Sequence, residues 1–187
     1  MLESERLCLR NYKESDINDY WEYVTNPLIG PACGWQPYTD KNLALERLKY
    51  ETTKPNQFAI VYKPDNKVIG AVELMDYNPE RYDSIDIDKD AKEIGFLLSE
   101  KYWGKGIMLE AVKLVMEYAF NTLNVPMIVI SHSEANIQSG KVQDKLGFKI
   151  VGRKDNYRPW LDGKMTNCIL RRMTKQEFNE LNKEYNN

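Results

Sequence analysis

The sequence predicts an α/β fold in which helices pack on a single mixed β-sheet of about seven strands. The evidence is the order of the segments: one strand, two helices, three strands, a helix, a strand, a helix and two strands. A charged helix then ends the chain. No internal repeat or low-complexity linker divides the chain. Since 187 residues suffice for one well-packed domain and are few for two, we expect one domain spanning residues 1–187.

The first segments alternate between strand and helix patterns. Apolar and polar residues alternate over Arg6–Arg10, which predicts the first strand. Ser15 is the expected N-cap of a helix that runs to about Val24. A loop rich in Pro and Gly follows at 26–38, and Thr39 is the expected N-cap of the second helix. That helix offers three leucines to a core: Leu43, Leu45 and Leu48.

Strands and one long helix fill the middle of the chain. Residues 57–62 and 68–74 read as a hairpin turned by Pro64-Asp65-Asn66, and 77–90 is a polar, acidic connection. A strand at 93–98 precedes a helix at about 106–120. Five residues of this helix share one apolar face, as a core-facing helix requires: Met108, Ala111, Val112, Val115 and Ala119.

The last segments read as three strands and two helices. A buried strand at 127–131 is followed by a short helix at 136–145 that stops at Gly147. The final strands are expected at 148–151 and 166–173. After them Thr174 and Glu177 have capping-box spacing, which predicts a terminal helix.

Composition excludes several classes of function. The net charge of −2 gives no general attraction to nucleic acid or to an anionic membrane. No apolar run approaches the roughly 20 residues of a membrane span, and the N-terminus resembles no targeting signal. Cys8, Cys33 and Cys168 are odd in number and far apart, so we expect packing residues in a reducing cytoplasm, with neither a disulfide framework nor a zinc site.

The most informative segment is the turn at 102–106, Tyr-Trp-Gly-Lys-Gly, between a strand and the long helix. Two glycines that open a helix present free backbone N–H groups at the positive end of the helix dipole, which suits a phosphate or pyrophosphate. A Walker loop would need Ser or Thr after Lys105, and a dinucleotide fingerprint would need glycine at Leu109. A plain strand–helix corner remains the alternative.

This segment resembles the acetyl-CoA-binding motif of the Gcn5-related N-acetyltransferase superfamily: Gln or Arg, two residues, Gly, any residue, then Gly or Ala. Lys101 stands at the first position and departs from this pattern. It keeps the positive charge of arginine but lacks the planar guanidinium group. The resemblance implies the acyl-CoA N-acyltransferase fold, with a mostly antiparallel sheet. It implies that backbone N–H groups of 103–108 hold the pyrophosphate and that Lys101 and Lys105 add attraction, although both are otherwise ordinary surface lysines.

A second match lies downstream, where Asn136-Ile137-Gln138-Ser139 is followed by Lys145-Leu146-Gly147-Phe148. It most resembles the branch of the ribosomal-protein alanine acetyltransferases. Positions 136, 139 and 143 share one helix face, which by resemblance borders the pantetheine and the sulfur; Asn136 can alternatively be only a helix cap. Together the two matches imply these cofactor-binding residues: Phe96, Leu97, Leu98, Lys101, Trp103, Gly104, Lys105, Gly106, Ile107, Met108, Asn136 and Ser139.

The implied reaction transfers an acetyl group from acetyl-CoA to a primary amine by direct attack on the thioester. An alkyl amine has a pKa near about 10, so a base must take a proton, and Glu93 is the candidate. A salt-bridged strand residue is the alternative for Glu93. By resemblance, backbone N–H groups near Leu97 and Leu98 stabilise the oxyanion. Gln143 stands where many relatives have a tyrosine acid, and the resemblance implies that the Ser139 hydroxyl takes its place by hydrogen-bonding the sulfur; a residue that mainly binds CoA is the alternative for Ser139.

Other candidates carry weaker signals. His132 is the single histidine and ends a strand. A lone histidine in such a place is more often a partly buried polar residue than a catalyst. Aromatic residues are candidates for an acceptor pocket or for core and rim: Trp21, Trp35, Tyr38, Tyr157 and Trp160. Acidic residues of the connection are candidates to attract a cationic acceptor or to remain a solvated loop: Asp83, Asp86, Asp88 and Asp90.

We therefore expect a cytoplasmic, acetyl-CoA-dependent and metal-free N-acetyltransferase whose acceptor is a protein N-terminus or a small-molecule amine. Neither nucleic acid nor membrane is an expected partner. A non-catalytic module that senses acyl-CoA is the alternative, and an NTPase is disfavoured by the residue after Lys105. Many relatives form homodimers, and the sequence leaves the oligomeric state and the acceptor open.

Overall fold

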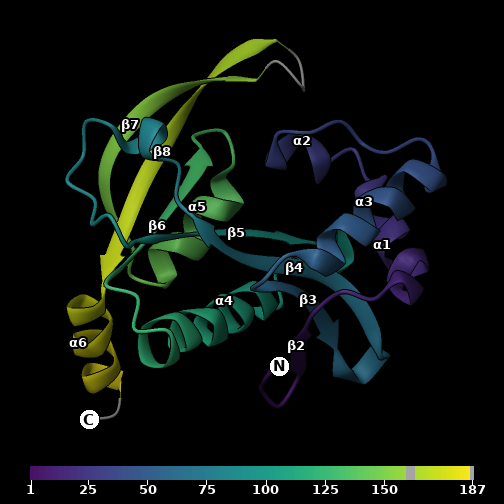
Figure 1. The fold of residues 1–187 in the computed structure, drawn as a ribbon, viewed down its shortest axis with the longest axis horizontal. Helices are drawn as coiled ribbons and strands as arrows, with labels where there is room; N and C mark the ends of the chain where they lie inside the picture. Colours follow the sequence, from purple (N-terminus) through teal and green to yellow (C-terminus); the bar gives the residue numbers. More distant parts are fainter. Residues whose placement is uncertain (159–162, 186–187) are drawn as a thin grey trace.

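The computed structural model describes residues 1–158 and 163–185. Within them the strands form one mixed sheet of eight strands in the order β1-β2-β3-β4-β5-β6-β8-β7 (Figure 1). The expected α/β fold is confirmed, and the strand beyond the predicted seven is the short edge strand β1. The strands are β1 (Leu2–Glu3), β2 (Leu7–Arg10), β3 (Gln57–Tyr62), β4 (Lys67–Asp76), β5 (Lys92–Leu98), β6 (Met127–Ser133), β7 (Lys149–Arg158) and β8 (Lys164–Thr174).

The sheet opens between β5 and β6. All other neighbours pair antiparallel, whereas β5 and β6 are parallel and share only the pairs Lys92↔Ile128 and Glu93↔Val129. Beyond these pairs β5 stays on β4 as far as Leu98, and β6 stays on β8 as far as Ser133. The two strands therefore diverge, as Figure 1 shows, and the sheet is split along their C-terminal halves.

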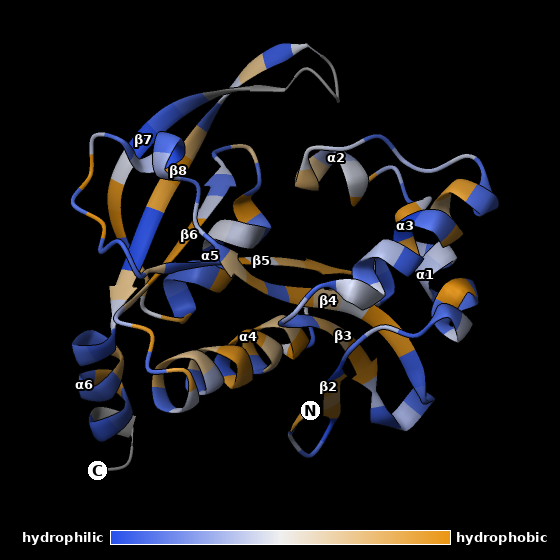
Figure 2. Ribbon diagram, viewed as in Figure 1, coloured by the Kyte–Doolittle hydropathy of each residue, from blue (hydrophilic) through white to orange (hydrophobic). Residues whose placement is uncertain are grey.

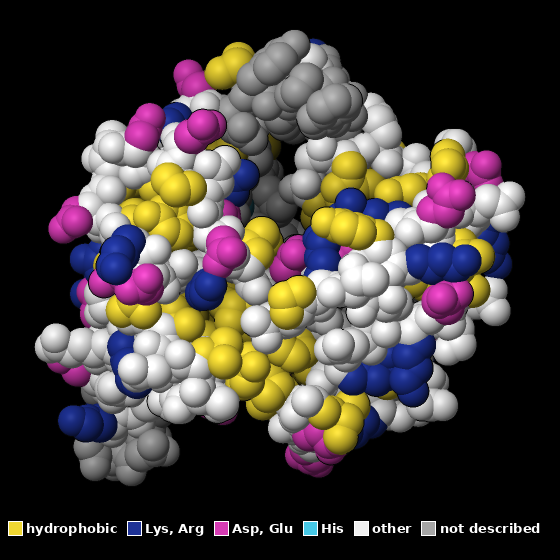
Figure 3. All heavy atoms as spheres, viewed as in Figure 1, with side chains coloured by type: hydrophobic (Ala, Val, Ile, Leu, Met, Phe, Trp, Pro, Cys, Tyr) yellow, Lys and Arg dark blue, Asp and Glu magenta, His cyan; other side chains and the backbone are white. Residues whose placement is uncertain are grey.

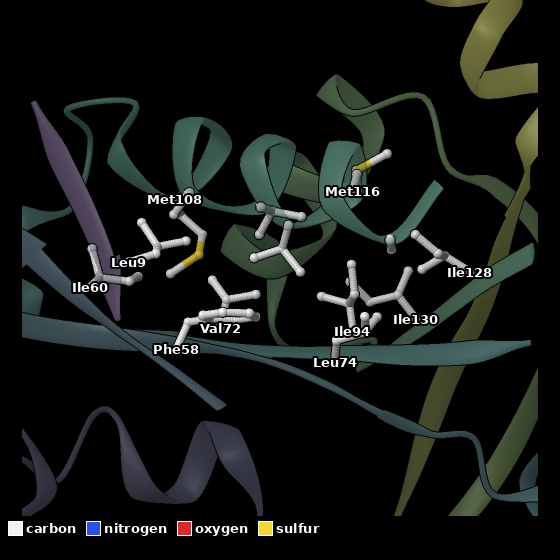
Figure 4. Close-up of a cluster of buried hydrophobic side chains, with 14 of the residues drawn as sticks. Leu9, Phe58, Ile60, Val72, Leu74, Ile94, Met108, Met116, Ile128 and Ile130 are labelled. Atoms are coloured by element: carbon white, nitrogen blue, oxygen red, sulfur yellow. The ribbon is translucent and has the colours of Figure 1, made fainter. Parts of the chain in front are cut away.

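One face of the sheet is covered by α4 (Ile107–Glu117), which continues into a π turn at Tyr118–Thr122. Its predicted apolar face is buried, and Figure 2 shows that face turned toward the sheet. In Figure 4 Met108 and Met116 lie over side chains from several strands, among them Ile60, Val72 and Ile94. Alternating strand residues therefore point toward α4, and their neighbours point to the other face. Further along, α5 (Ile137–Lys145) packs beside α4.

The opposite face carries two separate apolar clusters. One joins α1 (Ile17–Val24) and α3 (Lys41–Thr53) to the middle of the sheet, with α2 (Gly30–Cys33) nearby. The other surrounds Tyr82 and lies on β6 and β8. This face is consequently covered at both sides and leaves room between the clusters.

The expected helix caps in the N-terminal half are wrong by one residue. Ser15 lies inside a 3₁₀ turn, Glu14–Asp16, and the N-cap of α1 is Asp16, whose carboxylate accepts from Lys13 N at 2.8 Å. Asp40 rather than Thr39 caps α3 and accepts from Asn42 N at 2.8 Å. Asp40 follows Thr39 directly, and its carboxylate is an equally good acceptor. The Asp16 side chain caps no N–H of α1 and accepts from the residue before the 3₁₀ turn. The predicted core position Leu43 is 55% exposed, and Ala44 takes its place in the core.

Other segments differ in length or gain a turn. The loop at 26–38 contains α2, and the acidic connection contains a 3₁₀ turn, Pro79–Tyr82. The hairpin of β7 and β8 is longer than predicted because its polar outer residues also pair. The capping box is confirmed: Thr174 N donates to Glu177 at 2.8 Å, and Glu177 N donates to Thr174 Oγ1 at 3.2 Å, at the start of α6 (Lys175–Tyr185). Within the described residues no helix combines the length and the apolar character that a membrane crossing needs.

Candidate active site

The glycine turn has the backbone that its sequence predicts. Gly104 and Gly106 both lie in the left-handed region, with φ of +75° and +73°. A Cβ at Gly104 would meet nothing within 4 Å, and one at Gly106 would meet only Arg6 Nη2, at 4.0 Å. The glycines are therefore needed for conformation and not for space.

The backbone donors of this turn are mostly unpaired. Among the described residues none accepts a hydrogen bond from the N–H groups of 104–109, and the first intrahelical bond is Glu110 N to Gly106 O at 3.2 Å. The prediction fails for Trp103, whose N–H donates to Glu100 O at 3.1 Å. A row of free N–H groups at a helix N-terminus is suited to a pyrophosphate.

The two lysines of the motif differ. Lys101 forms an ion pair with Glu22 at 3.1 Å, so it is partly neutralised. Lys105 instead places its ammonium 4.9 Å from the centre of the Tyr102 ring. Arg6 holds the turn by donating to Lys105 O at 3.2 Å while it pairs with Glu110. Lys105 is therefore the better placed of the two lysines to attract a phosphate.

A cavity of about 1250 Å³ lies at the split in the sheet. It is lined from both faces: Phe96 and His132 belong to the α4 side, whereas Glu93 and Ser133 belong to the opposite side. Figure 3 shows the molecule hollowed between the part that carries α2 and α3 and the part that carries β7 and β8. The residues of the glycine turn do not line this cavity.

Backbone donors of β5 point into the split. Ser99 N donates to Ile69 O of β4 at 2.7 Å, and antiparallel bonds recur at every second residue of a strand. Leu97 N–H therefore faces β4, so the expectation for Leu97 as an oxyanion donor is wrong, while the N–H groups of Phe96 and Leu98 face the side that β6 has left. Trp103 supports this direction, because its indole donates to Leu98 O at 2.9 Å.

Glu93 is buried on the face opposite α4, with 5% of its surface exposed. Its Oε1 is 2.5 Å from Arg81 Nη1 and accepts weaker bonds from Tyr82 at 3.3 Å and Ser131 at 3.5 Å. Burial, together with this carboxylate, raises the pKa of Tyr82, which therefore stays protonated as a donor. No described residue donates to Oε2 of Glu93, so that oxygen is available to another group.

On the α4 side Ser139 belongs to a polar chain. Its N–H donates to the Asn136 side chain at 3.1 Å, which confirms that Asn136 caps α5. Its Oγ accepts from Gln143 Nε2 at 3.1 Å, and Gln143 Oε1 lies 2.9 Å from His132 Nδ1. Burial lowers the pKa of His132 more than the bond to Gln143 raises it, so His132 is neutral at physiological pH.

The outer cavity is aromatic and acidic. Trp35 and Tyr38 line it, whereas Trp21 packs in the neighbouring cluster. Trp160 and the Tyr157 side chain lie outside the described residues. Asp83 lines the cavity but pairs with Lys154 at 2.8 Å. Cys8, Cys33 and Cys168 form no disulfide, and Cys33 is exposed on the cavity wall, so it is not the packing residue that we expected.

The structure thus gathers part of the predicted site around one cavity. Glu93, Phe96, Leu97, Asn136 and Ser139 line it. Sequence reasoning missed Arg81 as the partner of Glu93, since nothing in its polar segment distinguishes it. It also treated Gln143 and His132 separately, although their helix and strand positions were predicted.

The residues present fit acetyl-CoA. Free N–H groups and Lys105 suit a diphosphate, and the cavity at the split in the sheet is lined by Phe96, Ser139 and Glu93. Within the described part of the chain no group of three or more His, Cys, Asp or Glu residues has the geometry of a metal site.

Comparison with known families agrees with this geometry. Residues 6–149 match the model of the acetyltransferase (GNAT) domain. The chain belongs to the GNAT acetyltransferase family. A curated relative from Bacillus licheniformis, named uncharacterized N-acetyltransferase p20, is 26% identical over 182 residues, which cover 95% of this chain and 97% of the relative. The protein is thus an N-acetyltransferase of a family that uses acetyl-CoA.

Solved structures share the fold of this N-acetyltransferase. A GNAT acetyltransferase from Bacillus anthracis matches with a TM-score of 0.80 and 18% identity, covering 94% of this chain and 99% of the other. The ribosomal-protein-S5-alanine acetyltransferase of Vibrio fischeri gives 0.68 and 24%, covering 94% and 97%. The spermidine N-acetyltransferase of Vibrio cholerae, in complex with CoA and spermine, gives 0.74 and 17%, covering 94% and 99%. At these identities the likeness concerns the fold alone.

Proposed function

We propose that this N-acetyltransferase moves the acetyl group of acetyl-CoA directly to a primary amine, without an acetylated protein intermediate. The observation that supports this most is that one cavity reaches both faces of the split sheet. A thioester held from the α4 side and an amine entering from the opposite side can meet in the opening, so positioning supplies much of the catalysis.

In the proposed step the amine nitrogen forms a bond to the acetyl carbon, and the carbon–sulfur bond breaks with its electron pair going to sulfur. The N–H groups of Phe96 and Leu98 stabilise the oxyanion that forms between these events. Glu93 takes the proton that the amine nitrogen loses and releases it to water.

Glu93 suits this role because its two oxygens are used differently. Arg81, Tyr82 and Ser131 all contact Oε1 and fix the carboxylate. Oε2 has no hydrogen-bond partner among the described residues, and Glu93 lines the cavity. The base is therefore oriented by one oxygen and can accept a proton on the other, directly or through a water molecule.

The acceptor that we propose is a primary amine on a small molecule or at a protein N-terminus. Glu73 lies on the same face as Glu93 and is separated from it by Gly95, which has no side chain: Glu73 pairs with Gly95 across the strands, two residues from Glu93. Both carboxylates have a cation as neighbour, since Glu73 pairs with Lys54 at 3.1 Å and Glu93 with Arg81, but the acidic residues that line the cavity outnumber the basic ones, which favours a cationic acceptor. The Asn136–Ser139 match supports placement near the ribosomal-protein alanine acetyltransferases, and the spermidine acetyltransferase fold supports a small amine.

The proposal is tested by release of free thiol from acetyl-CoA against polyamines, amino acids, aminoglycosides and N-terminal peptides. Glu93→Gln is expected to lower kcat about 100-fold or more with a nearly unchanged KM for acetyl-CoA. Glu80→Gln is the matched control, because Glu80 lines the same cavity on another segment. Full turnover of Glu93→Gln at neutral pH would remove Glu93 from the base role. CoA binding without thiol release for any amine would favour the acyl-CoA-sensing alternative, which the relatives' names do not favour.

A further inference from the structure

A chain of buried polar side chains links β6 to α5 behind the cavity. Gln143 is 0% exposed and His132 is 8% exposed. Gln143 contacts His132 through Oε1 and Ser139 through Nε2, at 2.9 and 3.1 Å. Gly140 lets the ring approach the helix, because a Cβ there would lie 2.9 Å from His132 Nε2.

The chemistry of the amide fixes the direction of these bonds. An amide oxygen only accepts and an amide nitrogen only donates, so His132 Nδ1 carries a proton and Ser139 Oγ accepts one. The hydroxyl proton of Ser139 is then left over. A serine inside a helix often gives this proton to a carbonyl one turn back, but no described residue accepts it here. Ser139 also lines the cavity.

We propose that Gln143, itself oriented by His132, is a positioning residue that turns the Ser139 hydroxyl proton into the cavity, where it hydrogen-bonds the sulfur of the departing thiolate. The inference rests on the proposed function and adds two residues to it. Ser139 keeps its proton: the sulfur leaves with the carbon–sulfur electron pair and is stabilised by a charge-assisted hydrogen bond. The bond from Gln143 also makes the hydroxyl a stronger donor, since linked hydrogen bonds polarise one another.

A double-mutant cycle tests this inference in the full-length enzyme. Ser139→Ala is expected to lower kcat about 10- to 100-fold, the effect of losing one hydrogen bond to a charged group, with little change in the KM for acetyl-CoA. Gln143→Met, which keeps the volume, should give a similar loss alone and no further loss in the Ser139→Ala background. A merely structural role of Gln143 would persist in that background, so equal losses in both backgrounds would overturn the proposal.

Three further variants keep the test decisive if Gln143→Met fails to fold. Gln143→Glu can only accept, so it takes the Ser139 proton and should be as slow as Ser139→Ala; parent-like turnover would show that the amide points the other way. His132→Asn retains a donor near Nδ1 and should keep kcat, whereas His132→Leu should lose it. Absence of thiol release by the parent enzyme would instead refute the proposed function, so the two failures are distinguishable.

Discussion

Replacing Gly106 with alanine tests whether the glycine turn holds the pyrophosphate. The structure gives the size of the effect. The new Cβ would only touch Arg6 Nη2 at 4.0 Å, so no clash arises, and the cost is that of a non-glycine residue at φ +73°. That strain is about 1–2 kcal/mol. In a chain of this length it lowers Tm by about 2–8 °C.

The same strain should weaken CoA binding. If the free variant keeps φ near +73°, the strain appears in Tm alone. If it relaxes to a negative φ, Tm falls less, its N–H groups turn away, and binding must restore the strained conformation. An energy of about 1–2 kcal/mol then raises the Kd for CoA about 5- to 30-fold. Gly106→Val, with a β-branched side chain, should abolish binding while the protein still folds. Isothermal titration calorimetry with CoA and thermal melts measure both quantities on the same samples.

Gly34→Ala is the matched control. Gly34 has φ +90° after α2, and a Cβ there meets nothing within 4 Å. Its strain is therefore comparable, but it lies far along the chain from the turn. We expect a similar fall in Tm and an unchanged Kd. If a folded Gly106→Val variant bound CoA like the parent, the turn would not be the pyrophosphate site.

Three further predictions concern charge. Lys105→Met should raise the Kd for CoA about threefold to tenfold at low ionic strength and less at high ionic strength, because salt screens an exposed charge. Arg81→Met should lower kcat and cost about 1–2 kcal/mol of unfolding free energy, since it leaves the buried Glu93 carboxylate without its cation and solvent screens part of the pair. Partial burial by itself raises the pKa of Glu177. Hydrogen bonds to its carboxylate, first among them the bond from Lys149, have the larger effect and lower the pKa to about 2. The stabilisation is thus complete above the unfolded pKa of about 4.3 and disappears as pH falls through about 2, so the Tm difference between Glu177→Gln and the parent should vanish there.

The sequence predicts the parts of this fold in which local pattern and tertiary packing agree. The apolar face of α4 and the alternation of β5 are both repeated over several turns or residues, and the packed sheet uses them unchanged. At the ends of helices the pattern is a single residue, and neighbouring acceptors compete for it. Asp40 replaces the expected cap Thr39 for that reason, whereas a 3₁₀ turn at Glu14–Asp16 moves the start of α1 beyond Ser15. Helix α2 has only four residues, too few for a period to be recognised.

The candidate site likewise has one part that the sequence predicts and one part that it does not. The donor side depends on backbone N–H groups, whose directions follow from two glycines and from strand alternation. The sequence therefore predicts them except at Trp103, whose N–H is paired, and at Leu97, whose N–H faces β4. The acceptor side is assembled from α2, α3, the turn at Pro79–Tyr82 and the hairpin of β7 and β8. Arg81 reaches Glu93 only through that assembly.

The split in the sheet explains why these two sides can evolve independently. β5 is held by β4 along its whole length, and β6 is held by β8, so neither strand needs the other beyond Glu93 and Val129. The opening, with its unpaired N–H groups, therefore persists whatever segments cover the outer face, whereas the orientation of Glu93 depends on Arg81 and Tyr82 of one covering segment. Changes in the other covering segments would alter which amine enters while the chemistry at the opening stays the same. Exchanging the segment 26–38 for that of a relative should accordingly change the preferred amine in the thiol-release panel and leave the Kd for CoA unchanged.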